Sequence, residues 1–178
     1  GACGVLPAVL VPYFQKRCRD TDKILKAMYV AAGIGQIIAT RSSISGAAGG
    51  CQAEIGAASS MAAGALVYLQ GGDCTQIATA AAMAMKNLLG LVCDPVAGLV
   101  EVPCVKRNVI GTVNAMSAAD MAMAGITSRI PPDQVMDAMK EVGDKMDASL
   151  RETALGGLAH TEEAMKIAGK MHSSHENC

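Results

Sequence analysis

The chain has 178 residues and a formal net charge of −1, from 15 basic and 16 acidic residues. This balance excludes the strongly basic surface that is typical of proteins binding nucleic acid or anionic membranes. Hydrophobic residues make up 51% of the chain, but there is no Trp, one Phe, three Tyr and 12 Met. We therefore expect an all-α fold, a single compact domain of helices packed through small residues, because a sheet would use more β-branched and aromatic side chains.

The chain begins with Gly1 rather than Met, in a Gly-Ala-Cys-Gly turn that leads into an apolar run. We therefore expect further sequence of the same protein upstream of this turn. A basic segment followed by an apolar stretch and a cleavage site is missing, which argues against secretion. Residues 23–40 are an apolar stretch of helical length, and residues 20–22 offer an N-cap, so a helix is predicted here.

The longest uncharged stretch covers residues 55–72 and reaches the minimum length of a transmembrane helix. Because it also contains Ser59, Ser60, Gln70 and several glycines, we interpret it as a buried helix of a soluble protein. Asp73 can cap the helix that follows. Further helices are predicted over residues 73–89, 108–126 and 134–146, the last of them amphipathic and opened by two prolines.

Three segments contain too much Gly, Pro or Ser for regular helix, namely residues 42–50, 93–98 and 102–104. Residues 161–178 form a polar tail, and we expect the last eight of them to be weakly ordered. No linker, internal repeat or second domain is evident in the sequence. The predicted organisation is one helical domain over residues 1–160, with irregular cysteine-bearing loops, followed by the polar tail.

The seven cysteines are an odd number without a Cys-x-x-Cys pair, which argues against a secreted disulfide scaffold. Cys18 and Cys74 are interpreted as small buried hydrophobic residues. Cys51, Cys93 and Cys104 stand instead at junctions between predicted helix and irregular backbone, where free N–H groups can stabilise a thiolate. Their separations of 42 and 11 residues match no short ferredoxin motif, so spacing alone favours buried structural thiols over a metal or cluster site.

Three groups of residues carry a more specific signal than the spacing does. They are Ser42-Ser-Ile-Ser-Gly-Ala with Gly50-Cys51-Gln52-Ala-Glu54-Ile-Gly56, Gly90-Leu-Val-Cys93-Asp94-Pro95-Val96-Ala97-Gly98 with Val102-Pro103-Cys104 and Arg107-Asn108, and Arg151-Glu152-Thr153 with Gly156-Gly157-Leu158-Ala159. Together with the opening turn they resemble the α-chain domain of the bacterial iron–sulfur L-serine dehydratases over residues 1–159. In that family three cysteines hold a [4Fe–4S] cluster, and upstream α-domain sequence and a separate β domain or β chain complete the enzyme.

The resemblance implies a lyase that converts L-serine to pyruvate and ammonia, a step of amino acid degradation and gluconeogenesis in the cytoplasm. It implies that Cys51, Cys93 and Cys104 ligate the cluster and leave one iron open as a Lewis acid for the substrate hydroxyl. The expected partners are L-serine, the β domain or β chain, and further copies of the chain in a homo-oligomer, but neither nucleic acid nor membrane. The cluster can be absent from a fragment prepared in air, and the chain alone is expected to turn over little or nothing.

Candidates for binding the substrate carboxylate follow from the side chains near these motifs. Ser45, with Ser42 and Ser43, lies in a Gly-rich loop before the first cysteine, and it either binds the carboxylate or caps the next helix. Arg107 and Arg151 are candidates because a guanidinium group binds a carboxylate bidentately. Either arginine could equally form an ordinary surface or structural ion pair instead.

The general base stays unassigned at this stage. His160, His172 and His175 all follow the motifs and are interpreted as surface residues, and a base from the upstream sequence remains open. Cys3 is taken as non-ligating. Cys178 is either a fourth ligand of a resting cluster or an exposed thiol.

Other functions agree with parts of the sequence. A pyridoxal-phosphate dehydratase would catalyse the same net reaction, but it needs a Schiff-base lysine on an α/β scaffold, which the sequence does not indicate. A related iron–sulfur lyase that acts on cysteine is a nearer alternative, and the sequence does not fix the preference among serine, threonine and cysteine. A non-catalytic zinc or cluster scaffold is the alternative from a different class.

Overall fold

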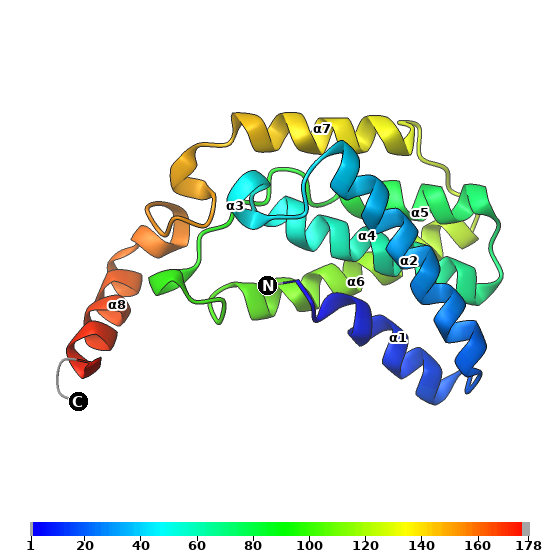
Figure 1. The fold of residues 1–178 in the computed structure, drawn as a ribbon, viewed down its shortest axis with the longest axis horizontal. Helices are drawn as coiled ribbons and strands as arrows, with labels where there is room; N and C mark the ends of the chain where they lie inside the picture. Colours follow the sequence, from blue (N-terminus) through cyan, green and yellow to red (C-terminus); the bar gives the residue numbers. More distant parts are fainter. Residues whose placement is uncertain (1, 176–178) are drawn as a thin grey trace.

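The computed structural model describes residues 2–175, with side chains up to residue 171. Over this range it contains helices and no strand, which confirms the predicted all-α class. Figure 1 shows the helices gathered around α4, with α7 running along one side of the domain. The elements are α1 (Val5–Lys16), α2 (Thr21–Arg41), α3 (Gly46–Gly49), α4 (Cys51–Gln70), α5 (Cys74–Lys86), η1 (Val96–Gly98), α6 (Cys104–Met123), α7 (Pro132–Lys145), η2 (Ala148–Leu150), η3 (Gly157–His160) and α8 (Glu162–His175).

Helix α4 is the centre of the domain. It contacts α1, α2, α5, α6 and α7, and most of its side chains are buried, so the prediction of a buried helix over residues 55–72 is confirmed. Small residues permit this packing, because a Cβ atom at Gly111 of α6 would lie 2.8 Å from the Cγ2 atom of Ile55 on α4. The hydroxyl of Ser59 donates a hydrogen bond to the carbonyl of Gly111 at 2.8 Å, which satisfies a buried polar group between the two helices.

The predicted helix starts agree with the structure where a side chain caps the helix. The carboxylate of Asp20 accepts a hydrogen bond from the first turn of α2, and Asp73 forms a capping box with Gln76 at the start of α5. Helix α6 differs, since it begins at Cys104 and therefore before the predicted start at residue 108. The proline predicts irregular backbone in this segment, whereas in the structure it directly precedes the helix.

Two cysteines that were predicted to be buried are not. Cys74, the first residue of α5, is exposed, and Cys18, which follows α1, is partly exposed. Both lie at helix ends next to solvent, so the apolar pattern of the neighbouring helix does not describe their own surroundings.

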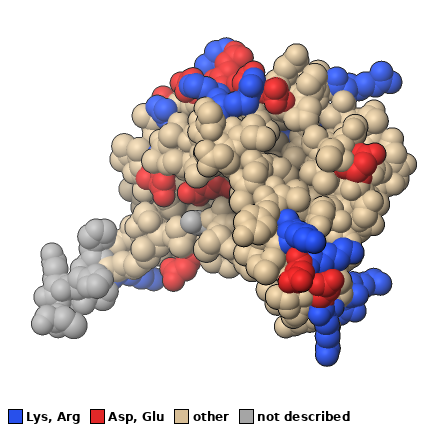
Figure 2. Space-filling model, turned by 45° about the vertical axis from the view of Figure 1, so that its right-hand side comes forward, with Lys and Arg blue, Asp and Glu red and all other residues tan. Residues whose placement is uncertain are grey.

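The described surface carries charged and uncharged areas. Figure 2 shows one face on which acidic and basic side chains lie together at the upper edge and at the lower right, with a largely uncharged area between them. Exposed apolar side chains occur on α2 and α6, including Leu25, Met28, Ile37, Val109 and Val113. Within residues 2–175, none of the helices combines the length and the apolar character needed to cross a membrane.

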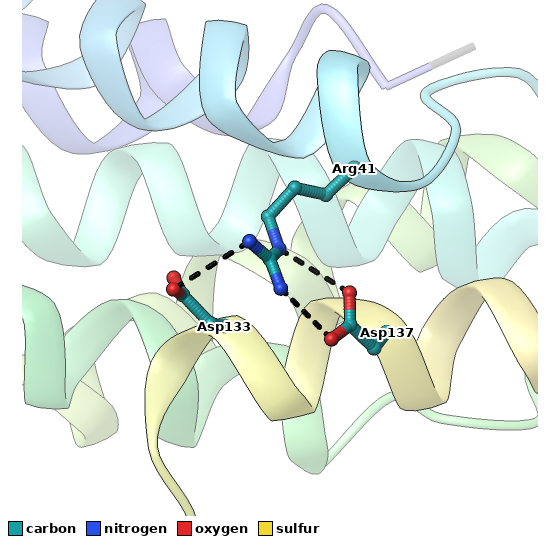
Figure 3. Close-up of polar contacts among 3 residues, drawn as sticks. All are labelled: Arg41, Asp133 and Asp137. Atoms are coloured by element: carbon teal, nitrogen blue, oxygen red, sulfur yellow. Dashed lines mark hydrogen bonds and ion pairs between the residues drawn. The ribbon is translucent and has the colours of Figure 1, made fainter.

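An ion-pair network links the end of α2 to α7 on the surface. Figure 3 shows Arg41 reaching from α2 to Asp133 and Asp137 on α7. The guanidinium donates to both carboxylate oxygens of Asp137, at 3.2 and 2.8 Å, and lies 3.6 Å from Asp133. Because all three side chains are at least 37% exposed, solvent screens the network, and we expect a contribution of about 1 kcal/mol or less.

The segment expected as a polar tail is helical from Glu162 to His175 and forms α8. This helix contacts η1 and η3 and buries Ala164, and Figure 1 shows it extending away from the helical body. Its first turn is acidic, and Lys166 pairs with Glu162 one turn earlier at 2.8 Å. Such charge placement supports a helix that buries little apolar surface.

Candidate metal centre

Two of the three predicted cysteine ligands occupy the first position of a long helix. Cys51 is the first residue of α4, and Cys104 is the first residue of α6. The first-turn N–H groups of a helix have no intrahelical partner, and the helix dipole favours negative charge there. Gly50 precedes Cys51 with a φ of 76°, a conformation that favours glycine, and it makes the sharp turn between α3 and α4.

Cys93 lies in the loop between α5 and α6 and is held by the segment that follows α7. Its N–H donates to the carbonyl of Leu150 at 2.8 Å, and its carbonyl accepts from the N–H of Glu152 at 2.7 Å. These bonds form an isolated parallel bridge between Cys93 and Arg151. Two motifs that are far apart in the sequence are therefore joined at the second cysteine.

The three thiols meet in one buried cluster. Cys51, Cys93 and Cys104 are 1%, 2% and 3% exposed and belong to one group of packed residues together with Ile55. The Sγ atoms of Cys51 and Cys93 and a carboxylate oxygen of Glu54 all lie within 4.8 Å of one another. A set of sulfur and oxygen donors this close can hold a metal ion.

The thiols change one another's protonation. A hydrogen bond from the Cys93 thiol, supported by Arg107, lowers the pKa of Cys51 to about 7 in spite of its burial. The same hydrogen bond and burial raise the pKa of Cys93, and burial raises the pKa of Cys104. The metal-free cluster therefore favours one thiolate, at Cys51, and a metal ion would displace the remaining protons.

Arg107 connects the first cysteine to the loop of the second. Its Nη1 atom donates to the carbonyl of Val92 at 2.8 Å and to the Sγ atom of Cys51 at 3.5 Å, and its Nη2 atom lies 2.8 Å from Asp94 Oδ1. The Arg107 and Asp94 side chains are only 15% and 4% exposed. Burial lowers the pKa of Arg107, but the hydrogen bond to Cys51 and the charge of Asp94 outweigh it and raise the pKa. The guanidinium therefore stays charged beside the thiolate.

Asp94 also anchors a second loop to the site. Its Oδ2 atom accepts a hydrogen bond from the N–H of Leu158 at 2.7 Å. Gly157, at a φ of 60°, passes so close that an added Cβ atom would lie 2.8 Å from the Cβ atom of Asp94. Only glycine accommodates both this conformation and this approach.

Two glutamates face the thiols. A Cβ atom added at Gly46 would lie 3.1 Å from Cys93 Sγ, 3.1 Å from Glu54 Cδ and 3.3 Å from Glu152 Oε2, so these three groups converge on the space beside this glycine. The sequence alone predicts a role for neither glutamate. Glu54 follows Cys51 by three residues and shares its helix face, which could have indicated it, whereas the position of Glu152 depends on the bridge at Cys93.

A groove leads from the surface to Glu54. It has a volume of about 420 Å³, lies between α1, α2 and α4, and is lined mainly by apolar side chains such as Leu6, Ile44 and Met61. Glu54 is the charged residue among the lining side chains. The groove therefore offers a small molecule a route to the edge of the thiol cluster.

The predicted substrate-binding residues lie in different surroundings. Ser45 is exposed at the start of α3, and its hydroxyl does not cap that helix. Arg151 is half-buried beside Cys93, and its guanidinium makes one long hydrogen bond, of 3.5 Å, to the carbonyl of Ala48. The guanidinium of Arg107 is engaged by the protein itself, as described above.

The remaining candidates lie towards the end of the chain. His160 is exposed at the end of η3. His172 and His175 belong to α8, but their side chains lie outside the described part of the structure, and so does all of Cys178. The role considered for Cys178 as a fourth ligand stays a prediction.

Comparisons with known proteins show which family the chain is similar to. A family model described as the serine dehydratase alpha chain matches residues 1–159. A probable L-serine dehydratase alpha chain of Bacillus subtilis (strain 168) is 53% identical over 171 residues, which cover 96% of this chain and 57% of that protein. One from Latilactobacillus sakei is 54% identical over 94% of this chain and 80% of its own length. L-serine dehydratase TdcG of Escherichia coli (strain K12) is 47% identical over 89% of this chain and 36% of its own length.

Proposed function

This chain belongs to the serine dehydratase alpha-chain family, and we propose that it supplies the cluster-binding part of an iron–sulfur L-serine dehydratase. The observation that carries the proposal is the meeting of Cys51, Cys93 and Cys104 from three separate segments in one buried site, two of them at helix N-termini. The chain spans 57% of the Bacillus subtilis protein that it matches. We propose that activity belongs to an assembled enzyme, with a β domain or β chain and further copies of this chain.

The residues present fit a [4Fe–4S] cluster. Three soft thiolates from separate segments suit iron–sulfur ligation, and glycine at position 46 lets the backbone pass close to Cys93, since an added Cβ atom there would lie 3.1 Å from its Sγ atom. Three thiolates on four irons leave one iron open, and this iron would act as the Lewis acid on the β-hydroxyl of the substrate.

The residues of this chain would hold the cluster and balance the negative charge of its thiolates. The N-termini of α4 and α6 and the buried Arg107 guanidinium stabilise the thiolates at Cys51 and Cys104. Ser45 and Arg151 lie on the two segments beside Cys93, and we propose them for the substrate carboxylate because their polar groups are least engaged by the protein. We assign Arg107 to thiolate stabilisation, since its donors are already used.

The proposed reaction is the loss of water from L-serine. The α-proton and the β-hydroxyl leave, the resulting enamine tautomerises to an imine, and water hydrolyses the imine to pyruvate and ammonia. No net oxidation or reduction takes place. All six described cysteines are free, which suits a reducing compartment, and we place the enzyme in the cytoplasm.

Anaerobic reconstitution tests the proposal. Treatment of the purified protein with iron and sulfide is expected to give a brown, oxygen-sensitive species, and the complete enzyme is expected to release pyruvate from L-serine only in this form. Uptake of stoichiometric zinc to give a colourless protein, without any uptake of iron, would contradict the proposal and favour a structural metal scaffold. Sulfide release from L-cysteine that exceeds pyruvate release from L-serine would favour the related cysteine lyase.

A further inference from the structure

Glu54 and Glu152 come from segments that are far apart in the chain, and both of their carboxylates lie beside the thiol cluster. Both carboxylates converge with Cys93 on the space next to Gly46. Within the described residues neither carboxylate makes a hydrogen bond or an ion pair, although Asp94 beside them is paired with Arg107. Negative charges this close to a thiolate repel one another, and the donors of Arg107 are already used by Cys51, Val92 and Asp94, so the two glutamates favour a positively charged ligand.

The surroundings of both glutamates favour a small ligand over a structural partner. Glu54 is half-buried in α4 and lines the groove between α1, α2 and α4, so a molecule in the groove can reach it. Glu152 has a φ of 63°, which is unusual for a residue with a side chain, and the bridge to Cys93 holds it in that conformation. The residue is exposed, so a molecule that comes from solvent can reach its carboxylate as well.

We propose that Glu54 and Glu152 bind the α-ammonium group of the substrate amino acid. This inference rests on the proposed function, because the substrate of a serine dehydratase carries one cation, its ammonium group, between its carboxylate and its β-hydroxyl. The ammonium group has three N–H donors, and two carboxylates can accept from it while the hydroxyl points to the cluster. The two glutamates thus select amino acids over hydroxy acids of the same size.

The test uses the complete reconstituted enzyme and two small molecules. L-serine carries the ammonium group, and 3-hydroxypropanoate has the same carboxylate and hydroxyl without it. For Glu54→Gln and Glu152→Gln we expect the KM for L-serine to rise about 10- to 100-fold, the loss typical of one charge-assisted hydrogen bond. The inhibition constant of 3-hydroxypropanoate is expected to change by less than about 3-fold, because this inhibitor never used the interaction.

Glu141→Gln is the matched control, since Glu141 is an exposed residue of α7 that pairs with Lys145. It should leave both constants unchanged. Cluster content and the visible spectrum are measured for every variant and should equal those of the wild type.

Three results would overturn the inference. If both constants change equally, the glutamates do not distinguish the ammonium group. If kcat falls while the KM for L-serine stays the same, they act in chemistry rather than in binding. If the substitutions remove the cluster, they are ligands of the metal. A wild-type enzyme that takes up no cluster or forms no pyruvate would instead contradict the proposed function.

Discussion

The middle and the beginning of α4 and α6 differ in how far their polar groups are hydrogen-bonded within the protein. In the middle, Asn114 donates to the hydroxyl of Ser59 and to the carbonyl of Ala84, both at 2.8 Å, so the buried polar groups satisfy one another. At the beginning, the same two helices present Cys51, Cys104 and the half-buried carboxylate of Glu54, which has no hydrogen bond or ion pair among the described residues. Polar groups without internal partners are costly unless a ligand completes them. The contrast separates a region built for stability from one built for binding.

The largest expected effect concerns the cysteines. Cys93→Ala should abolish cluster retention after anaerobic reconstitution, because the thiol is buried beside that of Cys51 in the same cluster. Cys74→Ala, the control, changes an exposed thiol outside the site and should leave iron and sulfide content as in the wild type. Equal loss of the cluster from both variants would show that the ligands are assigned wrongly.

Arg107→Met should have the next largest effect, since it leaves the carboxylate of Asp94 buried without its cation. We expect the free energy of unfolding to fall by about 3 kcal/mol, the usual cost of breaking a buried ion pair, and cluster retention to fall with it. Chemical denaturation of the metal-free chain and iron content after reconstitution measure the two effects. A variant as stable as the wild type would mean that solvent reaches Asp94.

The middle region is tested by adding a methyl group to a helix contact. In Gly111→Ala the new Cβ atom would lie 2.8 Å from Ile55 Cγ2 and 3.1 Å from Val5 Cγ2, both on stiff β-branched side chains. We expect a net loss of about 1 kcal/mol, as overpacking outweighs the gain in helix propensity. Gly33→Ala on α2 is the control, because nothing lies within 4 Å of its added Cβ atom, and thermal unfolding should show it to be as stable as the wild type or more stable.

The smallest effect is expected for Arg41→Ala, which removes the exposed ion pairs to Asp133 and Asp137. The free energy of unfolding should fall by about 1 kcal/mol or less, and this loss should shrink further in high salt. Urea denaturation at low and high salt measures it. A loss as large as that of Arg107→Met would contradict the distinction between exposed and buried pairs.

Local signals in the sequence predicted the parts of the fold that local chemistry decides. The cap at Asp73 and the uncharged run of α4 predicted helices that the structure confirms. Helix α1 was not predicted, because Pro7 and Pro12 lie within it. A proline in the first turn is tolerated, and the helix continues through the second, where it contacts α4 and α6. Helix α8 was also missed, because it buries too little apolar surface to leave a periodic pattern.

The candidate site was predictable only in part for a related reason. The junction positions of Cys51 and Cys104 followed from the glycine and proline before them. The role of Arg107 between Cys51 and Asp94 and the approach of Glu152 depend on contacts between segments that are distant in the chain. Such contacts arise from tertiary packing, and propensity and spacing in a single sequence do not encode them visibly.

The bridge between Cys93 and the segment after α7 sets an order of events during biosynthesis. A ribosome releases the chain from its N-terminus, so both helix-terminal thiols and the whole of α4 emerge well before Leu150 and Leu158, which close over the second cysteine loop. Helices α1 to α6 contact one another within residues 5–123 and can begin to pack before α7, which contacts α2, α3, α4 and α5, is available. The loop that carries Cys93 therefore cannot be closed before residues 150–158 have been translated.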